Sequence, residues 1–277
     1  MSDRIELVGV GGGSRSAGEL ATAAEVPDLG LDDLADRSDA LVVAVPPASM
    51  PDVIREVAGR VRALLVEAPV PVNLPDPGCP AMLGANFLHA PVVRGALRTI
   101  AAMESPHHLI LRSTQPAPTW GSHRTPAFGG AGLDPGGRLA PLLFAATGET
   151  VESAHAQITE EPESGVENEA SFAFTLPSGR TARLESVWAP GSARGELEVA
   201  SDLEVALLSL FPEPMLEVNG TPVATEPCHP LLALGFIPQL ERLSGVVDGS
   251  ATTWLDLGAG EAICGLLASA VDSARER

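Results

Sequence analysis

The chain contains neither lysine nor tyrosine, so all 17 of its basic residues are arginine. Lysine and tyrosine are common proton donors when an enzyme reduces a carbonyl or an imine. An enzyme of that kind built on this sequence must therefore move its proton through another type of side chain.

Positive charge is scarce as well. The 17 arginines face 36 aspartate and glutamate residues, which gives a net charge of -19. Such a chain repels phosphate backbones and anionic headgroups, so we expect neither nucleic acid nor a membrane among its partners. We expect a small-molecule metabolite instead.

Cysteines and aromatic residues are few. The three cysteines, Cys79, Cys228 and Cys264, show no spacing typical of a metal site. They indicate reduced thiols in a cytoplasmic protein, and we predict no bound metal. Aromatic residues make up 4% of the chain against 45% for all apolar residues, so the core should consist mainly of Leu, Val and Ala. We expect no targeting segment, and no apolar run reaches the ~18 residues of a membrane span.

The first third of the chain alternates short apolar runs with helical patterns. Strands are expected at Ile5 to Val10, Ala40 to Val45 and Ala63 to Val66, and the last two runs are typical of strands covered on both faces. Helices are expected near residues 17–25, 32–36 and 51–61. Strands that alternate with helices on short loops indicate a parallel, doubly wound sheet.

A glycine-rich segment follows the first expected strand. Gly9, Gly11 and Gly12 fit the start of the Gly-x-Gly-x-x-Gly pattern that holds a pyrophosphate at a helix N-terminus, although Ser14 occupies the sixth position. The stretch from Gly9 to Pro46 is too short for two successive crossovers, which need roughly 30 residues for each βαβ unit. We therefore expect that one βα unit is missing.

The middle of the chain shows the alternation of a mainly antiparallel sheet. Six strands are expected, at residues 109–112, 151–158, 170–176, 181–188, 195–200 and 204–210. Two closing helices should follow, near residues 231–244 and 261–274, and the apolar stripe of the second should pack on the first domain. The predicted fold class is α/β, with a truncated Rossmann-like domain over residues 1–104, an α+β open-sheet domain over residues 105–230 and closing helices over residues 231–277.

Three motifs carry a resemblance to a known family. They are Val43 to Pro47, Glu67 to Pro69 and Leu133 to Arg138. With these motifs the chain resembles the Gfo/Idh/MocA oxidoreductase family over nearly its whole length. The resemblance implies a Rossmann domain followed by an α/β domain, whose large open sheet would pair in a homodimer.

Two alignments of the N-terminal strand with this family are open. In one, Ile5 to Val10 is the family's second strand, Ser14 and Arg15 lie where that strand meets the adenosine ribose, and the first strand with its glycine loop is absent. In the other, Ile5 to Val10 is the first strand and the second is absent.

At the family's functional positions this chain carries other residues. Ala68 stands where the family has its proton-donating lysine, Arg138 where it has a histidine, and Pro141 where it has an aspartate that faces the nicotinamide. Leu88 and His89 replace an arginine and an aromatic residue. We therefore expect that no cofactor binds, with NADP as the alternative.

The resemblance places the candidate site at the junction of the two domains. The predicted catalytic residues are Glu67, His89 and His123, because a carboxylate and an imidazole can exchange a proton near neutral pH. The predicted substrate-binding residues are Asn86, Trp120, Arg124, Asp134 and Arg138, where an arginine could hold an anionic substrate. If NADP binds after all, the predicted contacts are Gly11, Gly12, Ser14 and Arg15.

Three functions fit these observations. The first is a cofactor-independent biosynthetic enzyme that catalyses a non-redox proton transfer, such as a cyclisation, an elimination or an isomerisation. The second is an NAD(P)-dependent oxidoreductase of the Gfo/Idh/MocA type. The third is a non-catalytic binding or scaffold partner of an active homologue.

Overall fold

The chain folds into two compact units. The computed structural model describes residues 9–10, 31–118, 124–125, 129–161, 164–211, 213–224, 226 and 228–277. The first unit comprises Met1–Gly84 and a returning segment, Gln239–Ala262. The second comprises Ala85–Pro238 and Ile263–Arg277. The domain boundaries at residues 104 and 230 stay a prediction from the sequence.

The first unit is built on a parallel sheet. Its strands, in spatial order, are β1 (Gly9–Val10), β2 (Ala40–Val43), β3 (Ala63–Glu67) and β4 (Ala81–Gly84). Its helices are α2 (Leu31–Arg37), the short 3₁₀ helix η1 (Pro47–Ser49) and α3 (Met50–Val57). Strands and helices alternate along the chain, as the sequence predicts, and each pair of neighbouring strands is parallel.

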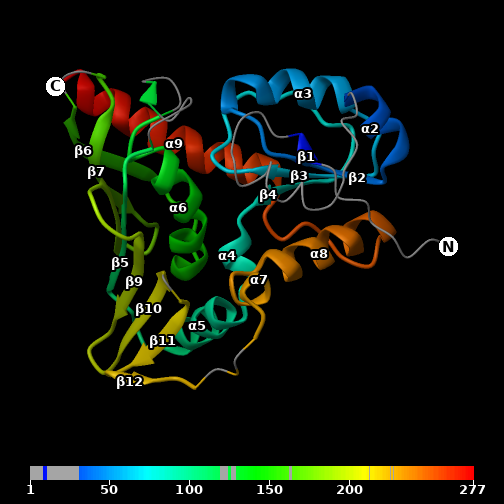
Figure 1. Ribbon diagram of the computed structural model, residues 1–277. Coiled ribbons are helices and arrows are strands. Elements are labelled where there is room, and N and C mark those ends of the chain that lie inside the picture. Colours follow the sequence, from blue (N-terminus) through cyan, green and yellow to red (C-terminus); the bar gives the residue numbers. More distant parts are fainter. Residues whose placement is uncertain are drawn as a thin grey trace. The chain divides into compact units, whose positions relative to one another are not determined.

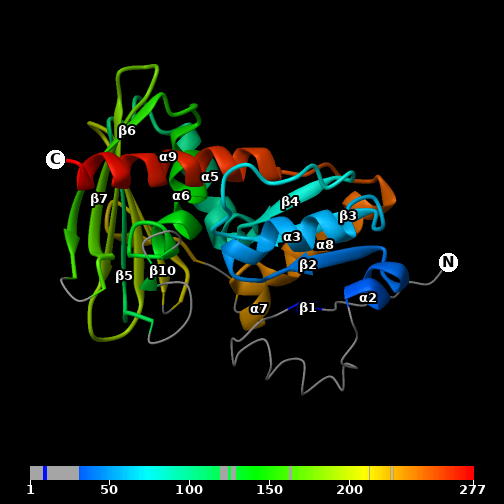
Figure 2. The ribbon, with the colours of Figure 1, turned by 90° about the horizontal axis from the view of Figure 1, so that it is seen from above.

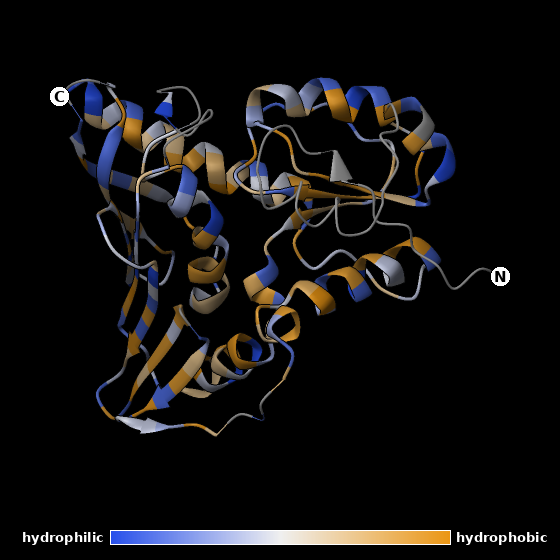
Figure 3. Ribbon diagram, viewed as in Figure 1, coloured by the Kyte–Doolittle hydropathy of each residue, from blue (hydrophilic) through white to orange (hydrophobic). Residues whose placement is uncertain are grey.

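Apolar side chains fill both faces of this sheet. All four residues from Ala63 to Val66 of β3 are buried, which explains the continuous apolar run. Helix α3 lies on one side of the sheet, and α8 (Phe236–Asp248) lies on the other (Figure 1). Leu243 and Val246 of α8 pack with Leu65 in one buried cluster. The strands are correspondingly orange in Figure 3.

The pairing of β1 bears on the choice between the two alignments. In a doubly wound sheet of order 3-2-1-4-5-6, the first three and the last three strands each follow one another as neighbours, and the first strand also lies beside the fourth. The consecutive neighbours β2, β3 and β4 fit the last three positions. The strand beside the fourth is then the first, and Gly9 and Val10 of β1 pair in parallel with Val42 and Val43 of β2. This pairing favours the alignment that keeps the first strand and its glycine run.

The second unit contains a large, mainly antiparallel sheet. Its described strands, in spatial order, are β12 (Thr221–Pro222), β11 (Met215–Val218), β10 (Val205–Phe211), β9 (Arg194–Ala200), β5 (His108–Gln115), β8 (Thr181–Trp188), β7 (Glu167–Thr175) and β6 (Ser153–Glu160). Among these neighbours, β5 and β8 run parallel and the others antiparallel. The six expected strands are confirmed within a few residues.

Helices cover one face of this sheet. The helices of this unit are α4 (Asn86–His89), α5 (Pro91–Ala102), α6 (Asp134–Thr147) and α7 (Pro230–Ala233), and α9 (Leu257–Arg275) ends in it. Helix α6 contacts β5 and β8, and α5 contacts β10 and β11 (Figures 1 and 2). Along β8 the residues facing α6 are buried and the alternate ones are more exposed. The expected single helix at 231–244 is two helices, because Gly235 adopts a positive φ of 84° between α7 and α8.

The opposite face of the large sheet is more polar. There Arg112 of β5 contacts Glu185 of β8 and Glu198 of β9, at 3.2 Å in each case. Pairing of two copies through this sheet stays a prediction from the family resemblance.

Helix α9 is long and apolar enough, by length and composition alone, to cross a membrane. The core helix of a soluble protein meets the same criterion, and Leu267, Ala270 and Val271 of α9 are buried within the protein. The length and composition of α9 therefore do not assign it to a membrane.

A glycine at the end of β4 generates the first prediction. A Cβ atom on Gly84 would lie 2.8 Å from Cδ and 2.9 Å from Cα of Glu67 on the neighbouring strand, and backbone atoms cannot yield as a flexible side chain can. Gly84→Ala should therefore lower the free energy of unfolding by about 1–3 kcal/mol. Gly95→Ala is the matched control, because a Cβ there meets only Arg98 Nη2 at 4.0 Å. It should stabilise α5 by about 0.5–1 kcal/mol. Chemical denaturation of both variants checks the pair, and equal effects would contradict the prediction.

Candidate functional site

The carboxyl edge of the parallel sheet carries small, exposed residues after β2. All four strands end at this edge, which is where α/β sheets bind their ligands. After β2 the small residues Ala44 and Pro46 are exposed, so bulky side chains do not cover the backbone there. The segments that follow β2 and β3, residues 44–49 and 67–70, contain no basic residue. A pyrophosphate at this edge would therefore depend on backbone N–H groups rather than on side chains of these two segments.

Glu67 is the charged side chain at this edge. It ends β3, is half-buried and lies against the position that a Cβ of Gly84 would fill. The next residue, Ala68, is only 5% exposed, and the peptide bond between Ala68 and Pro69 is cis. At the position of the family's lysine, this chain thus has the small, buried side chain of Ala68, directly after the carboxylate of Glu67.

Two predicted residues lie on the short helix α4 of the second unit. Asn86 begins α4, and its side-chain amide donates to the carbonyl oxygen of Leu234 at 2.8 Å. The adjacent Gly235 is packed so tightly that a Cβ would lie 2.0 Å from the carbonyl oxygen of Asn86. His89 ends α4 and is 5% exposed. Asn86 therefore holds the junction of α7 and α8, and His89 is a buried histidine.

Asp134 and Arg138 form an ion pair at the start of α6. The Asp134 side chain is 5% exposed, and its Oδ1 accepts from Nε and Nη2 of Arg138 at 3.1 and 3.0 Å. Its Oδ2 accepts from the amide of Gln115, the last residue of β5, at 3.4 Å. The guanidinium group of Arg138 stays half-exposed. The Asp134 carboxylate fixes its orientation and balances its positive charge. Gln115 was missed because the expected strand ended at residue 112.

Arg124 is engaged in the same way. It forms an ion pair with Glu161, which also accepts a hydrogen bond from the Ser164 hydroxyl at 2.7 Å. The Ser164 hydroxyl and the Arg124 charge together lower the pKa of the Glu161 carboxyl below its ordinary value. Both arginines that the sequence offers to an anionic substrate thus contact carboxylates of this chain.

Several predicted residues lie outside the described part of the chain. They are Trp120 and His123 of the predicted catalytic and substrate sets, and Gly11, Gly12, Ser14 and Arg15 of the NADP alternative. Among the residues that the structure describes, no three His, Cys, Asp or Glu side chains gather as a metal site would require.

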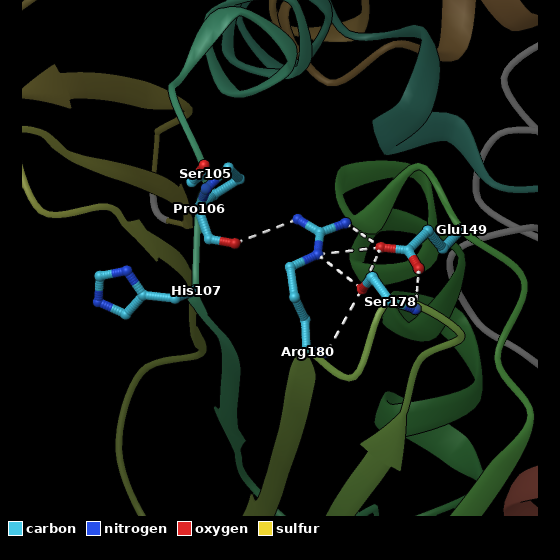
Figure 4. Close-up of a pocket in the computed structure, with 6 residues that line it drawn as sticks. All are labelled: Ser105, Pro106, His107, Glu149, Ser178 and Arg180. Carbon is cyan, nitrogen blue, oxygen red and sulfur yellow. Dashed lines mark hydrogen bonds and ion pairs between the residues drawn. The ribbon is translucent and has the colours of Figure 1, made fainter.

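A hollow of about 500 Å³ lies in the second unit. It is lined by Ser105, Pro106, His107, Glu149, Ser178 and Arg180 (Figure 4). Arg180 pairs with Glu149 and also donates to the carbonyl oxygens of Thr147 at 2.8 Å and Pro106 at 3.2 Å. The Arg180 contact, followed by bonds from Ser178, lowers the pKa of Glu149. The guanidinium is surrounded by acceptors of this chain, so the cluster links the β7–β8 turn to the end of α6.

Comparisons with known proteins give matches by structure. Searches against family models and against curated proteins found no match. The solved structure of GenD2 from gentamicin A biosynthesis, in complex with NAD, has a TM-score of 0.80 at 20% identity, covering 95% of this chain and 84% of that one. An aldose-aldose oxidoreductase from Caulobacter crescentus, complexed with glycerol, has a TM-score of 0.79 at 15% identity, covering 98% and 89%. A putative myo-inositol dehydrogenase from Sinorhizobium meliloti 1021 has a TM-score of 0.76 at 17% identity, covering 98% and 90%.

These matches correct one expectation and confirm another. The prediction that this scaffold carries no cofactor is contradicted, because a protein with the same fold over 95% of this chain was solved with NAD. The family's lysine, histidine and aspartate act on the substrate. Their replacement in this chain therefore does not indicate whether a nucleotide cofactor binds. The predicted fold class is confirmed: the chain has the two-domain fold of the Gfo/Idh/MocA-type dehydrogenases.

Proposed function

We propose that the chain binds a nicotinamide dinucleotide at the carboxyl edge of sheet β1–β4 and acts as an NAD(P)-dependent oxidoreductase. The observation that carries the proposal is the parallel pairing of β1, the strand before the glycine run, with β2, as expected if β1 is the first strand of a doubly wound sheet and β2 the fourth. The similarity in fold to an NAD complex supports the same conclusion.

The residues at this edge leave room for such a group, and the glycine run would have to supply the bonds to its phosphates. Exposed Ala44 and Pro46 leave the edge uncovered, as a close approach of a nucleotide to the backbone requires. The net charge of -19 disfavours loose attraction of phosphates, so binding would rely on directed N–H groups of Gly11 and Gly12. Ser14 and Arg15 would serve a 2'-phosphate, because a guanidinium matches a phosphate with two parallel hydrogen bonds.

Proton transfer is assigned to Glu67. The bound nicotinamide would supply hydride transfer to or from a carbon atom, and the matching hydroxyl proton needs an acceptor on the protein. The sequence has no lysine or tyrosine for this step, and Glu67 directly precedes the alanine at the lysine's position. A half-buried carboxylate at the end of a strand can take up and return that proton.

The substrate is proposed to be a small polyhydroxylated molecule. The solved proteins of this fold include one described as a putative myo-inositol dehydrogenase and one as an aldose-aldose oxidoreductase. Arg124 and Arg138 already contact carboxylates in this chain, so a neutral hydroxyl-bearing substrate fits them better than an anion that would have to displace Glu161 or Asp134.

Nucleotide binding is tested by thermal unfolding with NAD, NADH, NADP and NADPH. A ligand at 100 times its Kd adds about 2.7 kcal/mol, which corresponds to a rise in Tm of roughly 5–10 °C for a chain of this size. Arg15→Ala should weaken NADPH binding about tenfold and leave NADH binding unchanged, because only NADPH carries the 2'-phosphate. Arg37→Ala, at an exposed arginine that ends α2, is the matched control. Unchanged Tm values with all four nucleotides would refute the proposal.

The role of Glu67 is tested by Glu67→Gln. Turnover of a polyol should fall about 100-fold or more, since an amide cannot accept the proton, while the Kd of NADH should stay within twofold. Oxidation of a polyol panel, followed by the absorbance of reduced nicotinamide, gives the turnover. Glu56→Gln on the exposed side of α3 is the control. Equal turnover in Glu67→Gln and the wild type would remove Glu67 from the reaction.

A further inference from the structure

Helix α6 begins without a side-chain cap. The residue before it, Leu133, has no side chain that could accept from the first N–H groups. These groups donate to carbonyl oxygens of the preceding loop instead: Asp134 N to Gly130 at 3.0 Å, Gly136 N to Ala131 at 3.3 Å and Gly137 N to Leu133 at 3.0 Å. The position of the first turn of α6 therefore depends on the position of the loop of residues 130–133.

Glu167 of β7 holds that loop. Its side chain is fully buried, and Oε1 accepts from the backbone N–H of Gly132 at 3.3 Å. Its own carbonyl oxygen accepts from the N–H of Ala131 at 2.8 Å. Gly130 has a φ of 93°, and a Cβ there would lie 2.2 Å from Cδ of Glu167. The loop is thus fitted closely around one carboxylate.

Arg275, in the last turn of α9, balances the charge of this carboxylate. Its Nη2 donates to Oε2 of Glu167 at 2.8 Å. The same guanidinium also contacts the more exposed Glu160 at 2.9 Å and Asp272 at 3.5 Å. Burial raises the pKa of Glu167, and the charge of Arg275 opposes that rise. One cation therefore serves three carboxylates, of which only Glu167 also contacts the loop.

We propose that Glu167, with Arg275 as its counter-charge, is the positioning residue for the first turn of α6 and so for Asp134 and Arg138. A segment at the far end of the chain thereby sets the orientation of two candidate site residues. This inference rests on the proposed function in one respect, namely that Asp134 and Arg138 belong to the functional site. Its test uses neither nucleotide nor substrate, so its failure is distinguishable from a failure to bind nicotinamide.

The test compares Arg275→Ala, Glu167→Gln and the double variant with Glu160→Gln as the matched control. Glu160 shares Arg275 but is the more exposed of the two glutamates, and the bond from Gly132 goes to Glu167, so the Glu160 variant separates loop support from the general loss of an ion pair. Two local readouts are measured on the full chain. They are hydrogen exchange at the amides of Ala131 and Gly132, and the NMR signal of the Gln115 side-chain amide, which donates to Asp134.

Arg275→Ala should accelerate exchange at Ala131 and Gly132 at least tenfold and shift the Gln115 signal, whereas Glu160→Gln should change neither. Removing one partner of a buried pair leaves an uncompensated charge, so the Tm of Arg275→Ala at neutral pH should also fall by roughly 5–10 °C. The double variant should recover most of this loss, because a neutral glutamine needs no cation.

The pH dependence has a defined sign. A carboxyl whose folded pKa is raised favours folding when protonated, and that contribution is lost as the pH rises through the folded pKa. The Tm deficit of Arg275→Ala should therefore be largest at neutral pH and disappear on acidification through the raised pKa of Glu167. In a Glu167→Gln background the deficit should be small and change little with pH, because only the exposed partners Glu160 and Asp272 then remain to Arg275. A fall in Tm with unchanged exchange at Ala131 and Gly132 and an unmoved Gln115 signal would overturn the proposal.

Discussion

The burial of β3 on both faces is the constraint on which the first unit depends. A strand with no exposed face needs cover on each side, and in the part of this unit that the structure describes before residue 84, α2 and α3 provide one layer. The other layer comes from α8, more than 150 residues later in the chain, through Leu243 and Val246. The first unit is therefore completed only when the segment Gln239–Ala262 has returned to it.

Charge pairing organises the second unit in a similar way. With no lysine in the chain, its cations are all guanidinium groups, which can bond two acceptors at once. Arg180 joins the end of α6 to a hairpin turn, Arg138 neutralises a buried aspartate, and Arg275 serves a buried glutamate. Because acidic residues outnumber arginines, these arginines are tied to carboxylates of the protein itself. The result favours uncharged ligands over anions at the described part of the candidate site.

Much of the fold was readable from the sequence because its strands follow two clear rules. Continuous apolar runs at Ala40 and Ala63 predicted buried parallel strands, and alternation at Thr181–Trp188 predicted a sheet with one covered face. Strand β4 and helix α5 were missed, because β4 has only four residues and follows a proline-rich stretch, and α5 begins directly after the short helix α4. The break at Gly235 depends on its contact with Asn86, about 150 residues away in sequence, which no local pattern reveals.

The candidate site was only partly predictable for the same reason. Asp134 and Arg138 are one helical turn apart, so their pairing follows from spacing, but Gln115 and Glu167 reach α6 through the sheet. The cofactor was wrongly excluded because the missing lysine was weighed more heavily than the order of the strands. Backbone N–H groups can bind a pyrophosphate whatever side chain performs the chemistry.

The contacts of the last turn of α9 bear on how the protein is handled in the laboratory. Arg275 reaches a buried glutamate, and Arg277 donates to the carbonyl oxygen of Ala156 at 3.3 Å. An affinity tag or fluorescent label fused after Arg277 would begin beside these bonds and compete with them. A label at the exposed Glu56 of α3, in the first unit, would leave them intact.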